Sequence, residues 1–183
     1  MISKENHSLK NNRRTVKIVI CGGKECGKTT LAKRLTNTYN GTAPSKTIGV
    51  DLHFLNIHKD VLIEGNLWDV DGPKIPECIF NNVDIVLLVF AFNSKKSFQK
   101  LKELYKKIDK FEFSKLMLIG NKKDIPHRKV SDEEVKIFAD QHNMEFFKIS
   151  ALKGIGLENL RRKLRINMEE IIDEVYNLLG VVK

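Results

Sequence analysis

The residues best suited to chemistry lie between Gly22 and Thr30, where the chain reads Gly-Gly-Lys-Glu-Cys-Gly-Lys-Thr-Thr. This stretch contains the pattern G-x-x-x-x-G-K-[ST], which is typical of a phosphate-binding loop. Glycine permits tight turns that aim backbone N–H groups at phosphate oxygens, and a following helix N-terminus adds a positive dipole. Lys28 supplies a full charge for the β- and γ-phosphates, and the Thr29 hydroxyl suits Mg²⁺. We therefore predict that a nucleoside triphosphate binds Gly22, Gly23, Lys24, Glu25, Cys26, Gly27, Lys28, Thr29 and Thr30.

The segments on either side of this loop have the patterns of a strand and a helix. The apolar stretch before it predicts a buried strand over about 16–21, and Leu31, Ala32 and Leu35 recur at the spacing of a helix over about 28–38. The alternative is a glycine-rich turn that merely joins a strand to a helix. The strand–loop–helix setting is the context that a phosphate-binding loop requires, so it disfavours that alternative.

The composition is that of an ordinary globular protein with a basic balance. The chain has 183 residues, 42% of them hydrophobic, and a formal net charge of +9. Such a charge permits attraction to anionic membranes or nucleic acid. Because lysine is spread along the whole chain and no arginine-rich base-reading motif occurs, we do not expect nucleic-acid binding. Residues 1–14 are polar and basic, which predicts a flexible tail ahead of one domain over 15–180.

The cysteines and histidines suggest neither disulfides nor a zinc site. Cys21, Cys26 and Cys78 are odd in number and form no C-x-x-C, which favours a reduced, intracellular compartment. Cys26 lies in the loop, where positive potential would activate a thiol. The simpler interpretation is a small residue that fills the loop. The histidines form no metal-like cluster with the cysteines, so no zinc site is predicted.

The chain carries no pattern that predicts a membrane anchor. No apolar run approaches the length that spans a bilayer, and the N-terminus lacks the core of a signal peptide. Ile2 stands where myristoylation requires glycine, and the C-terminus has no cysteine to prenylate. We expect a cytoplasmic protein that reaches a membrane only through its charge or a partner.

Hydrophobic periodicity predicts strands that alternate with helices. A hairpin is expected over 50–58 and 61–69, a weak helix over 75–82, a central strand over 83–92, a helix over 95–110 and a strand over 116–119. A capping box at 131–134 begins another helix, and a strand over 145–149 follows. The last helix, about 157–179, is predicted to bury Leu160, Leu164, Met168, Ile171, Val175 and Leu178. This alternation predicts a doubly wound α/β domain.

Four further motifs stand at the ends of predicted strands. They are Thr47-Ile48-Gly49-Val50-Asp51, the D-x-x-G segment from Asp69 to Gly72, Asn121-Lys122-Lys123-Asp124 and Ser150-Ala151-Leu152. In this order and spacing they resemble the Ras superfamily of small GTPases, and the first looks most like the Rab branch. The resemblance covers about 15–179. It implies a P-loop NTPase fold, a small G domain, with a six-stranded, mostly parallel sheet, helices on both faces and one antiparallel hairpin strand.

The resemblance also implies that GTP or GDP is the ligand. The Asp124 carboxylate only accepts hydrogen bonds and matches the N1–H and 2-amino donors of guanine, which adenine lacks. By resemblance, Asn121 supports the base edge, and the stem of Lys122 packs over the ring. In the loop of Ser150, Ala151 and Leu152, the Ala151 N–H is expected to reach guanine O6. Leu152 departs from the family's usual lysine, which alters packing on the other face of the base.

The remaining motifs imply a magnesium site and two switch loops. By resemblance, Thr47 binds Mg²⁺ together with Thr29, and Asp69 holds a Mg²⁺-bound water. Gly72 offers its N–H to the γ-phosphate, so Lys28, Thr47 and Gly72 are the residues implied in catalysis. Contacts to the third phosphate order both loops, and hydrolysis frees them. By resemblance, Tyr39 is expected to cover the guanine edge.

Three residues depart from the family pattern near the γ-phosphate. Pro73 replaces the glutamine that orients the attacking water in active relatives, Lys24 replaces a small glycine, and Asp71 adds a carboxylate. We therefore expect intact GTP binding with slow hydrolysis. A competing hypothesis is that Lys24 substitutes in cis for an arginine finger.

Three classes of function remain open. The first is a monomeric GTP-dependent switch whose effectors and regulators the sequence does not identify. The second is a pseudo-GTPase that holds GTP as a structural ligand of an interaction module. The third is a basic protein with a vestigial fold that binds a membrane surface or nucleic acid.

Overall fold

The computed structural model describes residues 15–42, 44, 49–58, 62–71, 76–178 and 180. The predicted tail over 1–14 lies outside the described residues. The strands are β1 Thr15–Gly22, β2 Gly49–His58, β3 Leu62–Asp71, β4 Ile85–Ala91, β5 Lys115–Asn121 and β6 Glu145–Lys148. The helices are α1 Lys28–Leu35, the 3₁₀ helix Glu77–Phe80, α2 Lys95–Ile108, α3 Asp132–Gln141 and α4 Leu157–Leu178.

The strands form one six-stranded sheet in the order β2-β3-β1-β4-β5-β6. Neighbouring strands run parallel except β2 and β3, which pair antiparallel from Gly49 opposite Asp71 to His58 opposite Leu62. The β4 strand at the centre is buried along its whole length, as its continuous apolar run predicts. The predicted fold class, with one antiparallel hairpin strand in a mostly parallel sheet, is confirmed.

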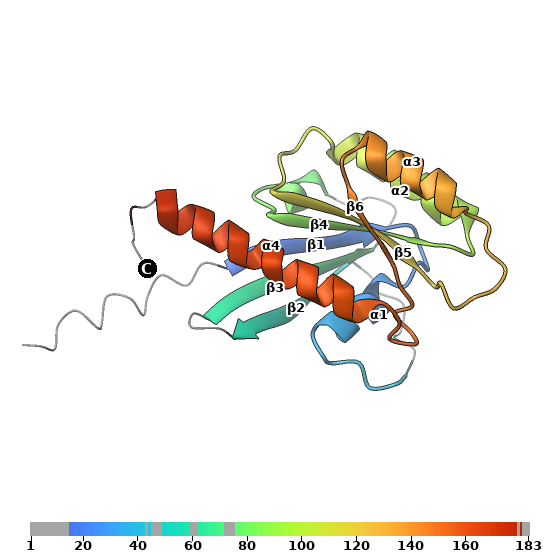
Figure 1. Ribbon diagram of the computed structural model, residues 1–183, viewed down its shortest axis with the longest axis horizontal. Helices are drawn as coiled ribbons and strands as arrows, with labels where there is room; N and C mark the ends of the chain where they lie inside the picture. The colour runs from blue at the N-terminus through green and yellow to red at the C-terminus, as the bar shows by residue number, and fades with distance from the viewer. Residues whose placement is uncertain are drawn as a thin grey trace, which may run out of the picture.

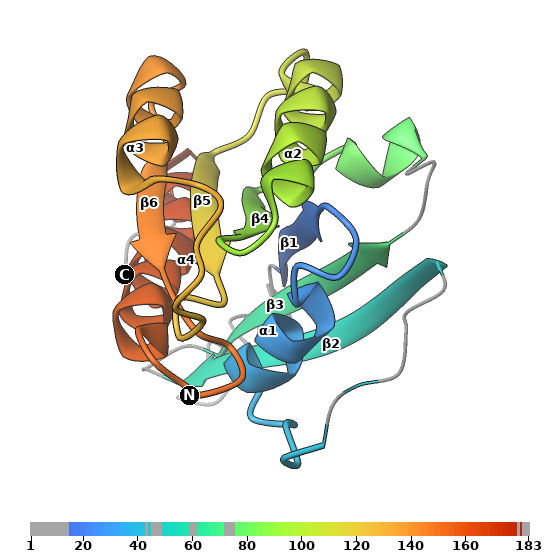
Figure 2. The ribbon, with the colours of Figure 1, turned by 90° about the vertical axis from the view of Figure 1, so that its right-hand side faces the viewer.

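Helices cover both faces of the sheet (Figures 1 and 2). One layer of the core packs α1 and α4 against one face, and the other packs α2 and α3 against the opposite face. Neither layer covers the outer strand β2 completely. Its side chains Val50, Leu52 and Phe54 therefore remain 39%, 46% and 64% exposed.

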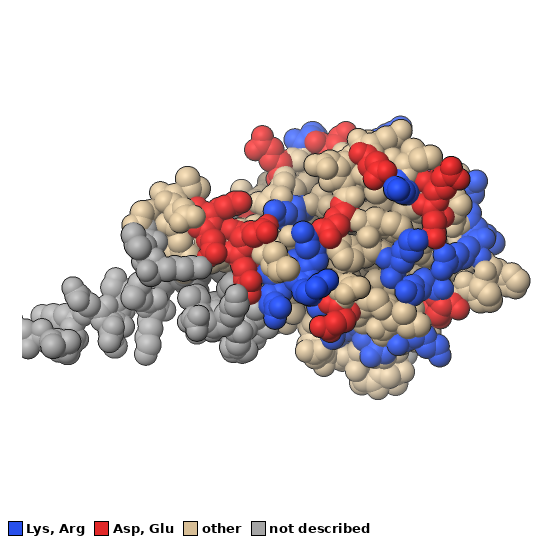
Figure 3. All heavy atoms as spheres, viewed as in Figure 1, with Lys and Arg blue, Asp and Glu red and all other residues tan. Residues whose placement is uncertain are grey.

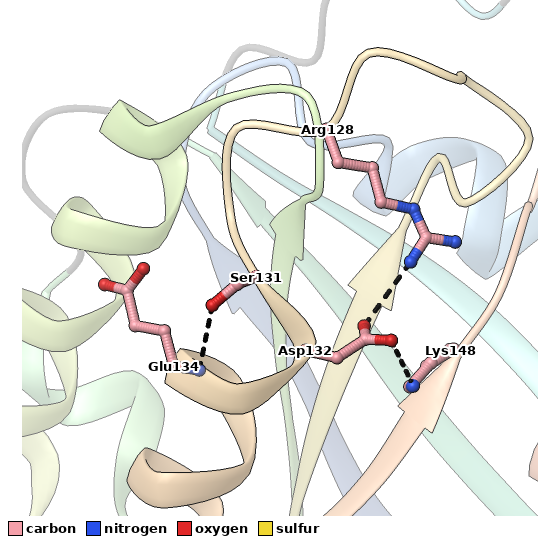
Figure 4. Close-up of polar contacts among 5 residues, drawn as sticks. All are labelled: Arg128, Ser131, Asp132, Glu134 and Lys148. Atoms are coloured by element: carbon pink, nitrogen blue, oxygen red, sulfur yellow. Dashed lines mark hydrogen bonds and ion pairs between the residues drawn. The ribbon is translucent and has the colours of Figure 1, made fainter.

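The start of α3 is held by a local cap and by contacts to neighbouring segments (Figure 4). The Ser131 hydroxyl accepts a hydrogen bond from the Glu134 N–H at 3.1 Å, which confirms the predicted cap. Asp132 receives Lys148 of β6 at 2.7 Å and Arg128 at 3.4 Å. These contacts fix the helix beside the edge strand of the sheet.

Two helix predictions were wrong in detail. The first helix ends at Leu35 rather than near 38, because Asn37 adopts a left-handed conformation (φ 58°) that stops the helix. Leu178, predicted to be buried, is 86% exposed. The last turns of α4 extend past the sheet (Figure 1).

Charge is divided along α4. Basic side chains gather over its N-terminal half and acidic ones over its C-terminal half (Figure 3). Among the described residues, no helix combines the length and apolar character needed to cross a bilayer.

Candidate nucleotide-binding site

The predicted ligand-binding segments meet along one edge of the sheet. Because β1, β3, β5 and β6 are parallel, their carboxyl ends lie on the same side. The phosphate loop follows β1, Asp69 lies near the end of β3, Asn121 ends β5, and the loop of Ser150 follows β6. Ligand sites of open α/β sheets form at this edge.

Close backbone contacts hold the phosphate loop in place. A Cβ atom at Gly22 would lie 1.9 Å from the Val89 carbonyl oxygen of β4, so only glycine fits there. Gly27 adopts a left-handed conformation (φ 90°) just before α1, and a Cβ there would lie 2.4 Å from the side-chain nitrogen of Asn121. The loop therefore packs against β4 on one side and the base-binding segment on the other.

Lys28 is a buried lysine at the start of α1. It is 4% exposed, and its Nζ donates a hydrogen bond to the Gly23 carbonyl at 3.1 Å. A buried ammonium needs oxygen partners or a nearby anion. Its position inside the loop suits the neutralisation of phosphate oxygens, so this residue fits a nucleotide.

Oxygen ligands for a magnesium ion come together between α1 and β3. The Thr29 hydroxyl donates a hydrogen bond to Oδ2 of Asp69, which is fully buried. Burial raises the pKa of Asp69, while the Thr29 hydrogen bond and the Lys28 charge act in the opposite direction. A hydroxyl beside a carboxylate suits a hard cation that keeps several waters, as Mg²⁺ does.

Asp69 is expected to lower the stability of the free chain at neutral pH. A carboxyl whose pKa is raised by folding contributes most at acidic pH, and that contribution is lost as the pH rises through its folded pKa. We therefore expect Asp69→Asn to raise the thermal midpoint of the nucleotide-free chain at pH 7. The same variant should bind Mg²⁺·GDP more weakly. A lower midpoint with unchanged nucleotide affinity would contradict this expectation, and calorimetry measures both quantities.

Asn121 connects three loops through its side-chain amide. Its Nδ2 donates to the Cys26 carbonyl at 2.8 Å, and its Oδ1 accepts from the N–H groups of Lys122 at 2.8 Å and Ala151 at 2.9 Å. The side chain is 2% exposed. One buried amide thus links the phosphate loop to both predicted base-binding loops. The Ala151 N–H, predicted to reach guanine O6, here donates to Asn121.

The other predicted base-binding residues surround this link. Lys122 has a left-handed backbone (φ 61°), and Asp124 has an exposed side chain next to it. Ser150 is fully buried, and its hydroxyl accepts from the Lys153 N–H at 3.1 Å. Leu152 is 53% exposed, so it is available to contact a ligand.

Arg34 is a positioning residue that the sequence interpretation missed. Its Nε and Nη2 atoms donate to the carbonyls of Ala151 at 3.0 Å and Leu152 at 2.7 Å. Its guanidinium also lies 4.0 Å from the ring centroid of Tyr39, which places that aromatic ring beside the base-binding loop. No local pattern signals this role, because Arg34 reaches partners more than a hundred residues away.

The structure describes only part of the remaining predicted site residues. Thr47, Gly72 and Pro73 lie outside the described residues, as does the side chain of Asp71. In the loop itself, Lys24 and Glu25 are exposed, while Thr30 is half-buried. Cys26 is fully buried and packs in the core layer of α1, which supports its interpretation as a small residue that fills the loop.

The chain is similar to Rab proteins along most of its length. A family model described as the Ras family matches residues 17–170. The Ras-related protein RABA1g of Arabidopsis thaliana is 29% identical over 170 residues, which cover 88% of this chain and 75% of that protein. Rab11B of Nicotiana tabacum is 28% identical, covering 89% and 76%. Rab-11B of Dictyostelium discoideum is 32% identical over 150 residues, covering 78% and 68%.

Proposed function

This chain belongs to the Ras family of small GTPases, and from that premise we propose that it is a Mg²⁺-dependent GTP switch with slow intrinsic hydrolysis. The observation that carries the proposal is the buried amide of Asn121, which joins the phosphate loop to the base-binding loops. A ligand that contacts both the phosphate loop and the base-binding loops is expected to carry phosphates at one end and a base at the other. The acceptor carboxylate of Asp124 favours guanine.

Each residue has a distinct part in holding the nucleotide. Lys28 and the N–H groups of the loop neutralise the phosphates. Thr29, and Asp69 through a water, would hold Mg²⁺, which would neutralise charge on the phosphates. By resemblance to the family, Thr47 and Gly72 are assigned to the γ-phosphate, so its loss would change the state of two loops.

The decisive experiment makes two measurements on one preparation of the purified protein. Nucleotide extracted from the purified protein is identified, and GTP turnover is then timed with Trp68 fluorescence as a second signal. Bound guanine nucleotide with slow turnover supports the switch. Failure to take up GTP or GDP in the presence of Mg²⁺, or a preference for ATP, would refute the proposal.

A nucleotide-locked interaction module is the second candidate. It is favoured by Pro73, which offers no polar side chain or N–H to orient water, and by the exposed Lys24 in the loop. Stoichiometric GTP that never turns over, even with cell extract, would identify this module.

Lys24→Gly is expected to raise the rate of GTP hydrolysis by up to about tenfold, because it clears space close to the transferring phosphate. Phosphate release under single-turnover conditions measures the effect, with Lys129→Gly as the matched control in another loop. A slower Lys24→Gly variant would instead show that Lys24 acts as a substitute for an arginine finger. Pro73→Gln should add to the gain, because it returns a side chain that orients water.

Effectors are proposed to bind the outer face of β2. Val50, Leu52 and Phe54 stand on one face of this strand and are exposed, beside Trp68 of β3. Apolar side chains gathered on a surface are typical of protein-binding sites. In the sequence, β2 stands between the two proposed switch segments, so a change of nucleotide is expected to alter the segments that flank it.

Membrane contact is proposed to be peripheral and electrostatic, for a protein that works in the cytoplasm as a monomer. The support is the net charge of +9. Salt-dependent binding to anionic vesicles that persists without nucleotide would favour the third class, a basic surface-binding protein. Salt-dependent binding to RNA would do the same and would contradict our expectation that nucleic acid is not a partner.

A further inference from the structure

Three possible metal ligands lie together on the β2–β3 hairpin, on the side of the sheet that faces α1. Asp51 stands directly opposite Asp69 in the antiparallel ladder, and His53 is two residues further along β2 on the same face. One ligand atom from each side chain lies within 4.8 Å of the other two. Only Asp69 belongs to the proposed magnesium site.

His53 carries a ring nitrogen that lacks a hydrogen-bond partner in the described part of the chain. The Nε2 atom of His53 is buried and has no hydrogen-bond partner among the described residues. A buried imidazole nitrogen without a partner is costly, because burial removes its hydrogen bonds to water. A metal ion that accepts this nitrogen would remove the cost. The neighbouring carboxylates differ in access, since Asp69 is fully buried and Asp51 is exposed, so an ion can enter from solvent.

The donor set identifies the class of ion. One imidazole nitrogen with two carboxylate oxygens is typical of Zn²⁺ and similar transition metals, whereas Mg²⁺ and Ca²⁺ prefer oxygen alone. In a tetrahedral zinc site, ligand atoms stand about 3.4 Å apart, because each lies about 2.1 Å from the metal. The ligand atoms lie within 4.8 Å of one another, so small side-chain rotations would close the site, and water would supply the fourth ligand.

We propose that Asp51, His53 and Asp69 form a second divalent-cation site, for Zn²⁺ or a similar transition-metal ion, which shares Asp69 with the magnesium site. The sequence interpretation predicted no zinc site because it compared histidines with cysteines along the chain. Strand pairing brings together ligands that lie 16 and 18 residues apart, as the register of Asp69 opposite Asp51 shows.

Sharing one carboxylate couples the two cations. Asp69 cannot hold a Mg²⁺-bound water fully while it ligates Zn²⁺, and the like charges of the ions repel. Zinc is therefore expected to lower the affinity for Mg²⁺ and to speed the release of bound GDP by about tenfold. This second half of the proposal rests on the proposed function, whereas the existence of the site does not.

The existence of the site is tested by Co²⁺ titration, followed through its visible absorption. The full chain is used with Cys78→Ser, which removes an exposed thiol that would also bind the metal. The expected result is one Co²⁺ per chain, displaced by Zn²⁺. His53→Gln and Asp51→Asn should each bind at least tenfold more weakly, while His127→Ala, an exposed histidine outside the group, should match the parent.

Two results would overturn the site. One is the absence of saturable Co²⁺ binding by the parent. The other is equal binding by the parent and His53→Gln. If His53→Gln does not fold, the Co²⁺ affinity of Asp51→Asn tests the site instead. The Asp51 side chain is exposed and adds little to the core, so this variant should fold.

The coupling is tested by release of a fluorescent GDP analogue at fixed Mg²⁺, with and without Zn²⁺. Zinc should speed release from the parent and leave His53→Gln unchanged. Saturable Co²⁺ binding without any change in release would overturn the sharing of Asp69. A chain that binds Co²⁺ but no guanine nucleotide would refute the proposed function and leave the metal site standing.

Discussion

Replacing Asp124 by asparagine is expected to weaken GDP binding by about 100-fold and to favour xanthine nucleotides instead. Asparagine keeps one acceptor but turns an N–H₂ group toward the 2-amino group of guanine, so two donors face each other. A lost or mispaired hydrogen bond to a charged group costs about 3 kcal/mol, which corresponds to about 100-fold in affinity. Xanthine carries an oxygen at that position, which restores the pairing.

Competition between GDP and XDP against a fluorescent analogue measures this change in preference. Because the Asp124 side chain is exposed, the variant should keep the parent's thermal midpoint. Asp140→Asn, an exposed aspartate in α3, provides the matched control and should bind GDP normally. An Asp124→Asn protein with unchanged GDP affinity would show that another group selects the base.

Replacing Asn121 by alanine is expected to affect both folding and nucleotide binding. The change removes the hydrogen bonds to the Cys26 carbonyl and to the N–H groups of Lys122 and Ala151. Buried groups without partners cost about 1–3 kcal/mol each, and water replaces some of them, so we expect about 3 kcal/mol of lost stability. The three loops also lose their common anchor, so GDP should leave about 100-fold faster.

Urea unfolding and the rate of GDP release test this prediction on one preparation. Asn159→Ala, at an exposed position of α4, controls for the loss of an amide and should stay within about 0.5 kcal/mol of the parent. Normal stability combined with fast release would limit Asn121 to ligand contact. If both the stability and the rate of GDP release were normal, Asn121 would not be the link between the loops.

The parts of the site that could be predicted from the sequence are local in the chain. The phosphate loop has a fixed spacing, and its residues meet because they are neighbours. The Asn121 link to Cys26 spans 95 residues, and the Arg34 bond to Ala151 spans 117, so no spacing rule reveals either. Such contacts depend on how strands are ordered across the sheet, which local periodicity does not determine.

The same limit explains the error at Leu178. Periodicity shows which face of a helix is apolar, but not how far the surface beneath it extends. Leu164 and Met168 lie over the sheet and are buried, whereas Leu178, on the last turn of α4, is 86% exposed.

The close contact of Gly22 with β4 also affects the energetics of ligand capture. Since the Val89 carbonyl leaves no room even for a methyl group, this end of the phosphate loop takes its shape when the sheet assembles, before any nucleotide arrives. A preorganised cradle loses little conformational entropy on association. Most of the free energy from the phosphate contacts is then available to order segments beyond the cradle, and calorimetry should report a small entropic penalty for a ligand as simple as pyrophosphate.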